Sequence, residues 1–251
     1  MPRANRYMFP GYTYHLTHRC VNKEHLLRYQ KDRKAYRKWL REGVRRHGVV
    51  LYGYCLTSNH VHVIARVDST ESVSKMMQLA AGTTAQAYNR RRGRSGAFWA
   101  EQYHCTVIED GDHLWRCLRY VDLNMVRAGV VEHPRQWEWC GYHELVGARQ
   151  RYRLLSVDDL LEALGGLSRD GFRESYKMGL DEVIAAEGDG QGAGERRPEW
   201  TEALAVGSRE FVEDLKGRYH RRLSIETQVQ PDGAGGRFWT LRDSEPPYRL
   251  S

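Results

Sequence analysis

Long hydrophobic runs and closely spaced cysteines are both missing from this chain of 251 residues. No apolar stretch approaches the roughly 18 residues that a membrane-spanning helix needs, so we expect no membrane partner. The N-terminal segment MPRANR lacks the apolar core of a secretion signal. The odd number and wide spacing of the cysteines argue against a disulfide framework and a thiolate zinc knuckle, and favour the reduced cytoplasm. The five cysteines are Cys20, Cys55, Cys105, Cys117 and Cys140.

Acidic residues are scarce in the first part of the chain. Residues 1–154 hold 26 Lys and Arg against 13 Asp and Glu, a net charge of +13. Residues 155–251 hold 13 against 19, a net charge of −6, and the two parts sum to the +7 of the whole chain. A basic body of this kind is typical of a protein that binds a polyanion. We therefore expect nucleic acid to bind the N-terminal part and not the acidic C-terminal part.

Two histidines separated by one valine stand in the stretch CLTSNHVHVIA, residues 55–65. Side chains alternate between the two faces of a β-strand, so His60 and His62 would point the same way. Two imidazoles side by side form half of a metal site. The pattern also fits two half-buried strand histidines, because random placement yields a His-x-His roughly 0.5 times in a chain of this composition.

Apolar spacing and turn residues predict alternating strands and helices before residue 130. The predicted strands are residues 11–19, 49–56, 60–67 and 103–109, and the predicted helices are residues 31–46, 69–90 and 112–127. This order is the split βαβ arrangement of ferredoxin-like folds. We predict an α+β core with one antiparallel sheet and with helices on one of its faces.

The composition changes beyond residue 150. We predict one domain over residues 1–150 and a smaller helical region over residues 151–230. Its expected helices start at Ser156 and span roughly residues 169–187 and 199–222. Residues 188–194 (GDGQGAG) have the composition of a flexible linker, and residues 231–251 that of a loose tail.

Two basic stretches are candidates for DNA contact. Lys34 and Lys38 lie on a basic stripe of the first predicted helix, which is either a solvated face or a phosphate-binding one. A cationic loop with Arg90, Arg91, Arg92 and Arg94 precedes Trp99 and Tyr103. Cations interleaved with aromatic rings suit single-stranded nucleic acid, because phosphates meet arginine while bases stack on rings. The alternative is a basic loop beside two core aromatics.

The helix predicted over residues 112–127 carries a phenol and an amide on one face, because Tyr120 and Asn124 are four residues apart. Two imidazoles and an amide oxygen would leave a bound metal its full dication charge, with open positions for phosphate oxygens. A phenol nearby could attack phosphorus and become linked to DNA. An ordinary phenol titrates near pH 10, so help from a cation is expected. The alternative is a tyrosine that packs its ring on the sheet.

Four motifs occur in an order that resembles the REP-associated tyrosine transposases, a branch of the single-tyrosine HUH transposases. They are GxxYHxTxR from Gly11, NHVH from Asn59, FWxxxY from Phe98 and YxxxNxVRAG from Tyr120. The resemblance covers about residues 1–150. It implies a ferredoxin-like catalytic core, a divalent metal (Mg²⁺ or Mn²⁺) and single-stranded DNA near a hairpin as substrate.

By motif position the resemblance implies that His60 and His62 bind the metal, that Tyr120 is the nucleophile and that Asn124 completes the site. His15, Arg19 and Arg127 fall within the same motifs and are expected DNA contacts. The chain departs from the family pattern at Ser58 and Met125, where the family usually has proline. Both changes alter backbone stiffness beside the site and remove no reacting group.

The predicted function is therefore a metal-dependent DNA endonuclease and strand transferase, that is, a transposase. A replication or mobilisation nickase is disfavoured because no GxxxxGK[ST] motif of a helicase is present. A catalytically quiet, domesticated protein that binds hairpins is the alternative from another class. The sequence leaves the choice between monomer and dimer open.

Overall fold

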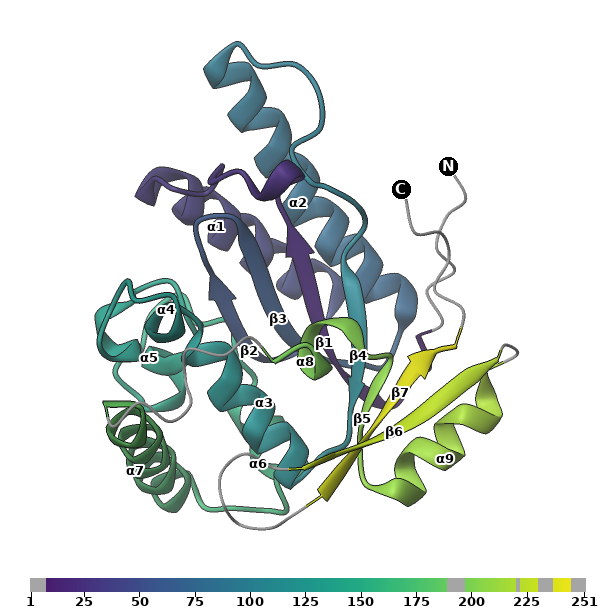
Figure 1. Cartoon of the computed structure of the whole chain (residues 1–251). Coiled ribbons are helices and arrows are strands. Elements are labelled where there is room, and N and C mark those ends of the chain that lie inside the picture. Colours follow the sequence, from purple (N-terminus) through teal and green to yellow (C-terminus); the bar gives the residue numbers. More distant parts are fainter. Residues whose placement is uncertain (1–7, 189–196, 220–221, 230–236, 245–251) are drawn as a thin grey trace.

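One seven-stranded sheet organises the protein in the computed structural model, which describes residues 8–188, 197–219, 222–229 and 237–244 (Figure 1). The strands follow the order β2-β3-β1-β4-β5-β7-β6 across the sheet. Their bounds are β1 (Tyr12–Arg19), β2 (Val50–Leu56), β3 (His60–Val67), β4 (His104–Ile108), β5 (Ala205–Gly207), β6 (Leu223–Val229) and β7 (Arg237–Asp243).

The first four strands form the ferredoxin-like core. β1 pairs with β3 and β4, and β3 also pairs with β2, all in antiparallel fashion. The connecting helices are α1 (Gln30–His47) and α2 (Thr70–Arg92). Gly48 ends α1 in the left-handed conformation that glycine adopts easily. The predicted α+β class and split βαβ core are confirmed.

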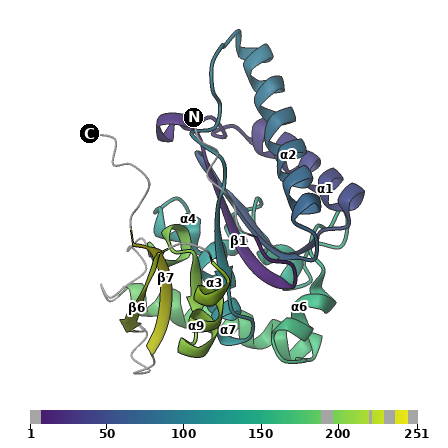
Figure 2. The same cartoon turned by 90° about the vertical axis from the view of Figure 1, so that its right-hand side faces the viewer.

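Helices cover both faces of this core. α1 and α2 pack together on one face, and α3 (Asp112–Asp122) lies on the other (Figure 2). The α1–α2 contact is close: a Cβ atom on Gly43 would lie 2.9 Å from Cγ of Met76. The prediction that helices occupy a single face was wrong, because α3 follows the fourth strand and buries its apolar side against β2.

The helix predicted over residues 112–127 is interrupted near its end. α3 ends at Asp122, and a short helix α4 (Asn124–Arg127) follows Leu123, whose φ of −76° and ψ of 0° depart from helical values. The backbone hydrogen bonds from Leu123 to Arg119 and from Arg127 to Leu123 keep both pieces nearly in line. Tyr120 and Asn124 consequently stay on neighbouring turns.

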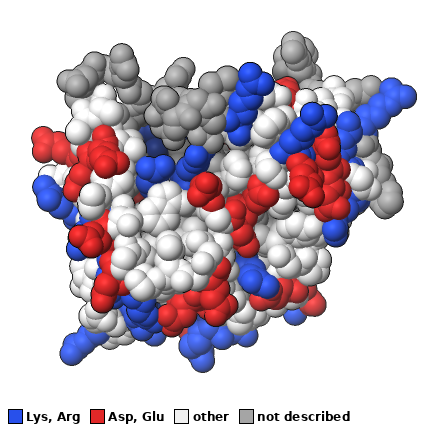
Figure 3. Space-filling view, turned by 90° about the horizontal axis from the view of Figure 1, so that it is seen from below, with Lys and Arg blue, Asp and Glu red and all other residues white. Residues whose placement is uncertain are grey.

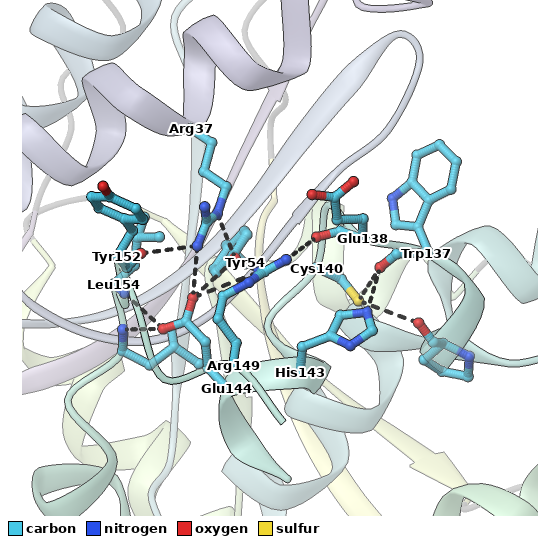
Figure 4. Close-up of polar contacts among 12 residues, drawn as sticks. Arg37, Tyr54, Trp137, Glu138, Cys140, His143, Glu144, Arg149, Tyr152 and Leu154 are labelled. Atoms are coloured by element: carbon cyan, nitrogen blue, oxygen red, sulfur yellow. Dashed lines mark hydrogen bonds and ion pairs between the residues drawn. The ribbon is translucent and has the colours of Figure 1, made fainter. Parts of the chain in front are cut away.

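The segment after α4 closes the edge of the sheet at β2. It contains the short helix α5 (Tyr142–Leu145), and the backbone N–H groups of Leu56 and Gly141 bond across the edge to Trp139 and Tyr54. Glu144 is fully buried and accepts hydrogen bonds from Tyr54 and Arg37 (Figure 4). Buried charges require such partners, and this network joins α1, β2 and α5.

The C-terminal part contains more strand than predicted. The expected helices near 156 and 169 are α6 (Val157–Ala163) and α7 (Arg169–Gly188). Residues 199–222 were expected to form one helix, but the structure has α8 (Glu199–Glu202), β5 and α9 (Arg209–Arg218). β5 pairs with β4 in parallel, and residues 237–244 of the expected tail contain β7. The linker prediction falls largely on residues 189–196, outside the described residues.

Acidic and basic side chains are interspersed on the face viewed from below, with no large area of one sign (Figure 3). None of the helices in the described ranges has the length and apolar character to cross a membrane.

Candidate active site

Strand pairing brings the two histidines of the His-x-His motif to the face covered by α3. In the β1–β3 register His60 stands opposite Arg19, and His62 stands opposite Thr17. The His60 and His62 ring centroids are 4.7 Å apart. His62 is buried at 1% exposure, whereas His60 at the beginning of β3 is half-buried.

A chain of hydrogen bonds fixes the proton positions of His62. Nδ1 of His15 lies 2.7 Å from the carbonyl oxygen of Trp200, which can only accept, so this nitrogen carries the proton. Nε2 of His15 therefore accepts from Nδ1 of His62 at 2.8 Å. Nε2 of His62 is then an acceptor and meets the Asn124 amide, whose Nδ2 lies 2.9 Å away.

Burial keeps both histidines of this chain neutral. It lowers the pKa of His15 to about 4 and the pKa of His62 well below its ordinary value, and the neighbouring His60 lowers the latter further. A neutral imidazole with an unprotonated Nε2 is the form that binds a metal. The Nδ1 donation to His15 is the support that metal-binding histidines usually have.

His60 is held by the turn that precedes it. Its Nδ1 lies 2.7 Å from Oδ1 of Asn59 and 2.9 Å from Oγ1 of Thr57. Because the amide oxygen of Asn59 only accepts, Nδ1 carries a proton, and Nε2 carries the lone pair when the ring is neutral. Thr57 also donates to the carbonyl of His60 at 2.9 Å, which anchors the start of β3.

Tyr120 packs beside the histidines. Its ring centroid lies 6.1 Å from that of His15 and 6.0 Å from that of His62. The guanidinium of Arg127 lies over the Tyr120 ring, 4.0 Å from its centroid, and donates to the Tyr120 carbonyl at 2.6 Å. Trp200 of α8 covers another side at 6.1 Å, and Tyr120 is 7% exposed.

The residues present fit a divalent cation. The unprotonated Nε2 of His62 can donate its lone pair to a metal, the His60 ring lies 4.7 Å away, and turning the Asn124 amide would present its oxygen instead of its nitrogen to Nε2 of His62. Within the described ranges no three His, Cys, Asp or Glu side chains converge on one point. A cation held here would therefore depend on Asn124 and on water or phosphate oxygens for its remaining ligands.

The predicted basic contacts occupy different places. Lys34 and Lys38 are exposed on α1, on the face opposite Tyr120, whereas Arg19 and Arg127 are half-buried beside the histidines. Arg90 and Arg92 are exposed at the end of α2. Arg91 pairs with the buried Asp32, and Arg94 bonds to the carbonyl of Ala97 and pairs with Glu24.

Three predicted DNA contacts instead make contacts within the protein, and two of them, His15 and Tyr103, are buried. His15 is fully buried, with both ring nitrogens bonded to protein atoms. Trp99 stacks on His18 at 4.1 Å and donates to the carbonyl of Ala81. Tyr103 is 6% exposed, and its hydroxyl contacts Ser74 of α2. The FWxxxY motif therefore belongs to the packing between β1 and α2, because its rings fill the space above that strand.

Two contributions to the site were missed from the sequence. One is the role of His15, which alternation could have placed on the same strand face as Thr17 and Arg19, and which pairing with β3 brings to His62. The other is Trp200, which is 185 residues from His15 and 80 residues from Tyr120. No local pattern indicates a contact of that separation.

The ferredoxin-like sheet thus carries the paired histidines and the helical tyrosine on one face. Residues 9–124 match the family described as transposase IS200 like. This region is similar to the IS200-like transposase family, in agreement with the resemblance seen in its motifs.

Two solved structures are similar to the chain. One is of a REP-associated tyrosine transposase bound to a REP hairpin, with 16% identity, a TM-score of 0.47, and coverage of 62% of this chain and 93% of the other. The second is of a candidate transposase from Deinococcus radiodurans R1, with 13% identity, a TM-score of 0.33, and coverage of 52% and 98%. None of the curated proteins matches the chain.

Proposed function

We propose that this protein is a transposase, that is, a metal-dependent endonuclease and strand transferase that cuts single-stranded DNA near hairpins and holds the 5′ phosphate on Tyr120. The observation that carries the proposal is the packing of the Tyr120 ring beside His15 and His62, with the Asn124 amide on Nε2 of the same His62. The proposed nucleophile and the proposed metal ligands thus lie on one face of the sheet. The hairpin part rests on the family resemblance.

In this proposal His60, His62 and Asn124 hold the cation, and His15 keeps Nε2 of His62 unprotonated. A divalent ion such as Mg²⁺ or Mn²⁺, when bound, would supply positive charge beside a phosphate oxygen. Arg127 is the cation beside Tyr120, because its guanidinium lies over the Tyr120 ring. A fixed cation beside the phenol favours loss of the phenol proton.

The proposed reaction exchanges one phosphodiester for another. The Tyr120 oxygen attacks phosphorus, the bond from phosphorus to the 3′ oxygen breaks, the phenol loses its proton and the leaving 3′ oxygen gains one. A second 3′ hydroxyl then attacks the phosphotyrosine and releases the Tyr120 phenol. No nucleotide hydrolysis is needed, because one ester bond forms for each that breaks.

Cationic residues at the site and at the end of α2 are the proposed phosphate contacts. Arg19 and Arg127 lie beside the histidines, and Arg90, Arg92 and Arg94 lie around the end of α2. Lys34 and Lys38 could contact only DNA that extends to the opposite face of the sheet. Arg91 forms an ion pair with the buried Asp32, so we assign it a structural role.

A catalytically quiet protein that binds hairpins is the second candidate, and the 7% exposure of Tyr120 under Trp200 favours it. Incubation of the full chain with a labelled, hairpin-flanked single strand and Mn²⁺ separates the two. A transferase yields a protein–DNA adduct that survives denaturation and contains the 5′ phosphate. DNA binding without any adduct supports the catalytically quiet protein that binds hairpins.

A further inference from the structure

A pocket of about 530 Å³ lies beside the last turns of α2, away from Tyr120. Its wall combines the segment between β1 and α1 with the end of α2, which projects beyond the sheet in Figure 1. The lining includes Lys23, Glu24, Arg28, Tyr29, Tyr88 and Arg92. Two phenol rings and three cations therefore surround one hollow.

The aromatic and cationic groups of this pocket are already stacked on each other. The Arg92 guanidinium lies 5.1 Å from the Tyr29 ring centroid and 5.9 Å from that of Tyr88. Arg28 lies 5.9 Å from the Tyr29 ring. Tyr29 is 47% exposed, which is unusual for a large ring, whereas Tyr88 rests on Phe98 at 5.1 Å. Tyr29 thus presents a half-exposed ring among cations.

The charge of the pocket is positive. Its one lining carboxylate, Glu24, is within 3.7 Å of Arg94. Among the described residues, no carboxylate forms an ion pair with Lys23, Arg28 or Arg92. Three cations beside one carboxylate that is already paired with Arg94 leave a net positive charge, which attracts an anion, and aromatic rings attract a flat ligand.

The pocket wall is connected to the candidate active site. Asn59 donates from Nδ2 to the carbonyl of Lys23 at 3.1 Å, and its Oδ1 accepts from His60. Lys23 has a φ of +58°, a conformation that costs energy outside glycine, so the Asn59 contact helps to hold it. The N–H of Leu27 also bonds to the carbonyl of Ser58 at 2.9 Å. One amide side chain therefore separates the pocket wall from a proposed metal ligand.

We propose that this pocket binds one nucleotide of the single-stranded DNA that flanks the hairpin, with its base on Tyr29 and its phosphate on Arg92, Arg28 or Lys23. The proposal rests on the function proposed above and adds a second point of strand attachment beside His60. A nucleotide carries both required features, a flat base and an anionic phosphate. A strand anchored here would enter the site from the His60 side.

Arg92 now covers the ring position that the base would take. Stacking of a base on a tyrosine is stronger than a cation–π contact at an exposed position. Exchange of the guanidinium for a base therefore favours binding, and the displaced Arg92 gains a phosphate partner of opposite charge.

The test compares Tyr29→Ala with Tyr152→Ala in the full chain. Tyr152 is a matched control, because it is 69% exposed and Arg41 lies 5.2 Å from its ring centroid. Tyr29 makes no side-chain cap bond to α1, so its removal should not unfold that helix. The probes are a fluorescein-labelled single strand, a hairpin with a single-stranded 5′ tail and the same hairpin without a tail.

We expect Tyr29→Ala to weaken binding of the single strand and the tailed hairpin about tenfold, with Tyr29→Trp close to wild type and Tyr152→Ala unchanged. Binding of the tailless hairpin should not change. Wild-type affinity of Tyr29→Ala for all three probes overturns the proposal. If Tyr29→Ala weakens binding of the tailless hairpin equally, the pocket contacts the hairpin and not the single strand, and the proposal is also overturned.

Photocrosslinking separates this proposal from the catalytic one. A tail that contains 5-iodouracil should crosslink to a peptide with Tyr29 or Tyr88, and crosslinks confined to other peptides contradict the pocket. The Tyr120 adduct is measured in the same samples. If the adduct forms without these crosslinks, the proposed catalytic function stands and the pocket proposal is contradicted. If the crosslinks form without the adduct, only the proposed catalytic function is contradicted.

Discussion

Nδ1 of His62 donates to Nε2 of His15 at 2.8 Å, and this contact sets which nitrogen of His62 faces Asn124. His15 can accept only because its own Nδ1 donates to the carbonyl of Trp200. The lone pair of His62 is thus directed by a residue of the C-terminal part of the chain. A site composed of strand and helix residues depends on α8 for its proton arrangement.

The first prediction concerns His15 as a positioning residue. His15→Ala leaves the buried Nδ1–H of His62 without its acceptor, so Mn²⁺ affinity should fall about 10- to 100-fold. The adduct yield measured against Mn²⁺ concentration should shift by the same factor and recover at saturating metal. Mn²⁺ binding measured by calorimetry without DNA should show the same shift.

His62→Ala provides the comparison, because it removes the proposed ligand itself and no Mn²⁺ concentration should restore cleavage. His60→Ala should behave in the same way, with hairpin binding retained in both. If His62→Ala cuts DNA as well as the wild type, the proposed metal site is contradicted. If His15→Ala needs the same Mn²⁺ concentration as the wild type, only the positioning role of His15 is contradicted.

Local patterns predicted the core well, because apolar periodicity and turn residues are properties of neighbouring positions. The strand predicted over 60–67 is β3 (His60–Val67), and the helix predicted over 31–46 is α1 (Gln30–His47). β5 was missed because its three residues, Ala205–Gly207, carry no period and are a strand only through pairing with β4. Long-range pairing overrode the local preference for helix over 199–222.

The candidate site was predictable where motif spacing is local and not where tertiary contacts decide. His60 and His62 share a strand face, as alternation requires, and Asn124 reaches His62 from a helix one turn after Tyr120. The surroundings of His15 and Tyr103 depend on which elements cover β1: His15 is buried against His62, and Tyr103 is buried against α2. Tertiary packing therefore affects the positions of the expected DNA contacts more than the positions of the proposed metal ligands.

The second prediction concerns the buried carboxylate of Glu144. Glu144→Ala removes the acceptor of Tyr54 and the ion-pair partner of Arg37, so the free energy of unfolding should fall by about 3–5 kcal/mol. Chemical denaturation measures this loss. Glu42→Ala, which breaks only ion pairs to Arg45 and Arg46 on the surface of α1, should cost much less. Equal losses would contradict the network.

The third prediction is a pH dependence of stability that arises from Asp122. Burial raises the pKa of this carboxyl to about 7, although Tyr176 donates to it at 2.8 Å. Between about pH 4 and 7 the folded state keeps a proton that the unfolded state has lost, so this contribution to stability decreases as pH rises. The slope is about −1.4 kcal/mol per pH unit.

Asp122→Asn isolates this slope. Buried histidines such as His15, whose pKa is lowered to about 4, give the opposite slope over much of the same range, so the variant is compared with wild type at each pH. The difference in unfolding free energy should change in favour of Asp122→Asn from pH 4 to pH 7 and stay constant above it. Tyr176→Phe removes the hydroxyl that stabilises the charged carboxylate, so the slope should extend to higher pH. A flat difference excludes a protonated Asp122.

The last prediction separates a strand transferase from a nuclease that activates water. The histidine pair with Asn124 would serve either enzyme, whereas only a transferase needs the Tyr120 hydroxyl. Tyr120→Phe removes that hydroxyl and keeps the ring that Arg127, His15 and Trp200 contact, so fold and DNA affinity should stay near wild type. Adduct, cleavage and strand transfer should vanish together on denaturing gels with a hairpin-flanked strand and Mn²⁺. Tyr103→Phe is the control, since its hydroxyl contacts Ser74 on the other face of the sheet, and it should keep all three. Cleavage by Tyr120→Phe that leaves a free 5′ phosphate would show that water is the nucleophile.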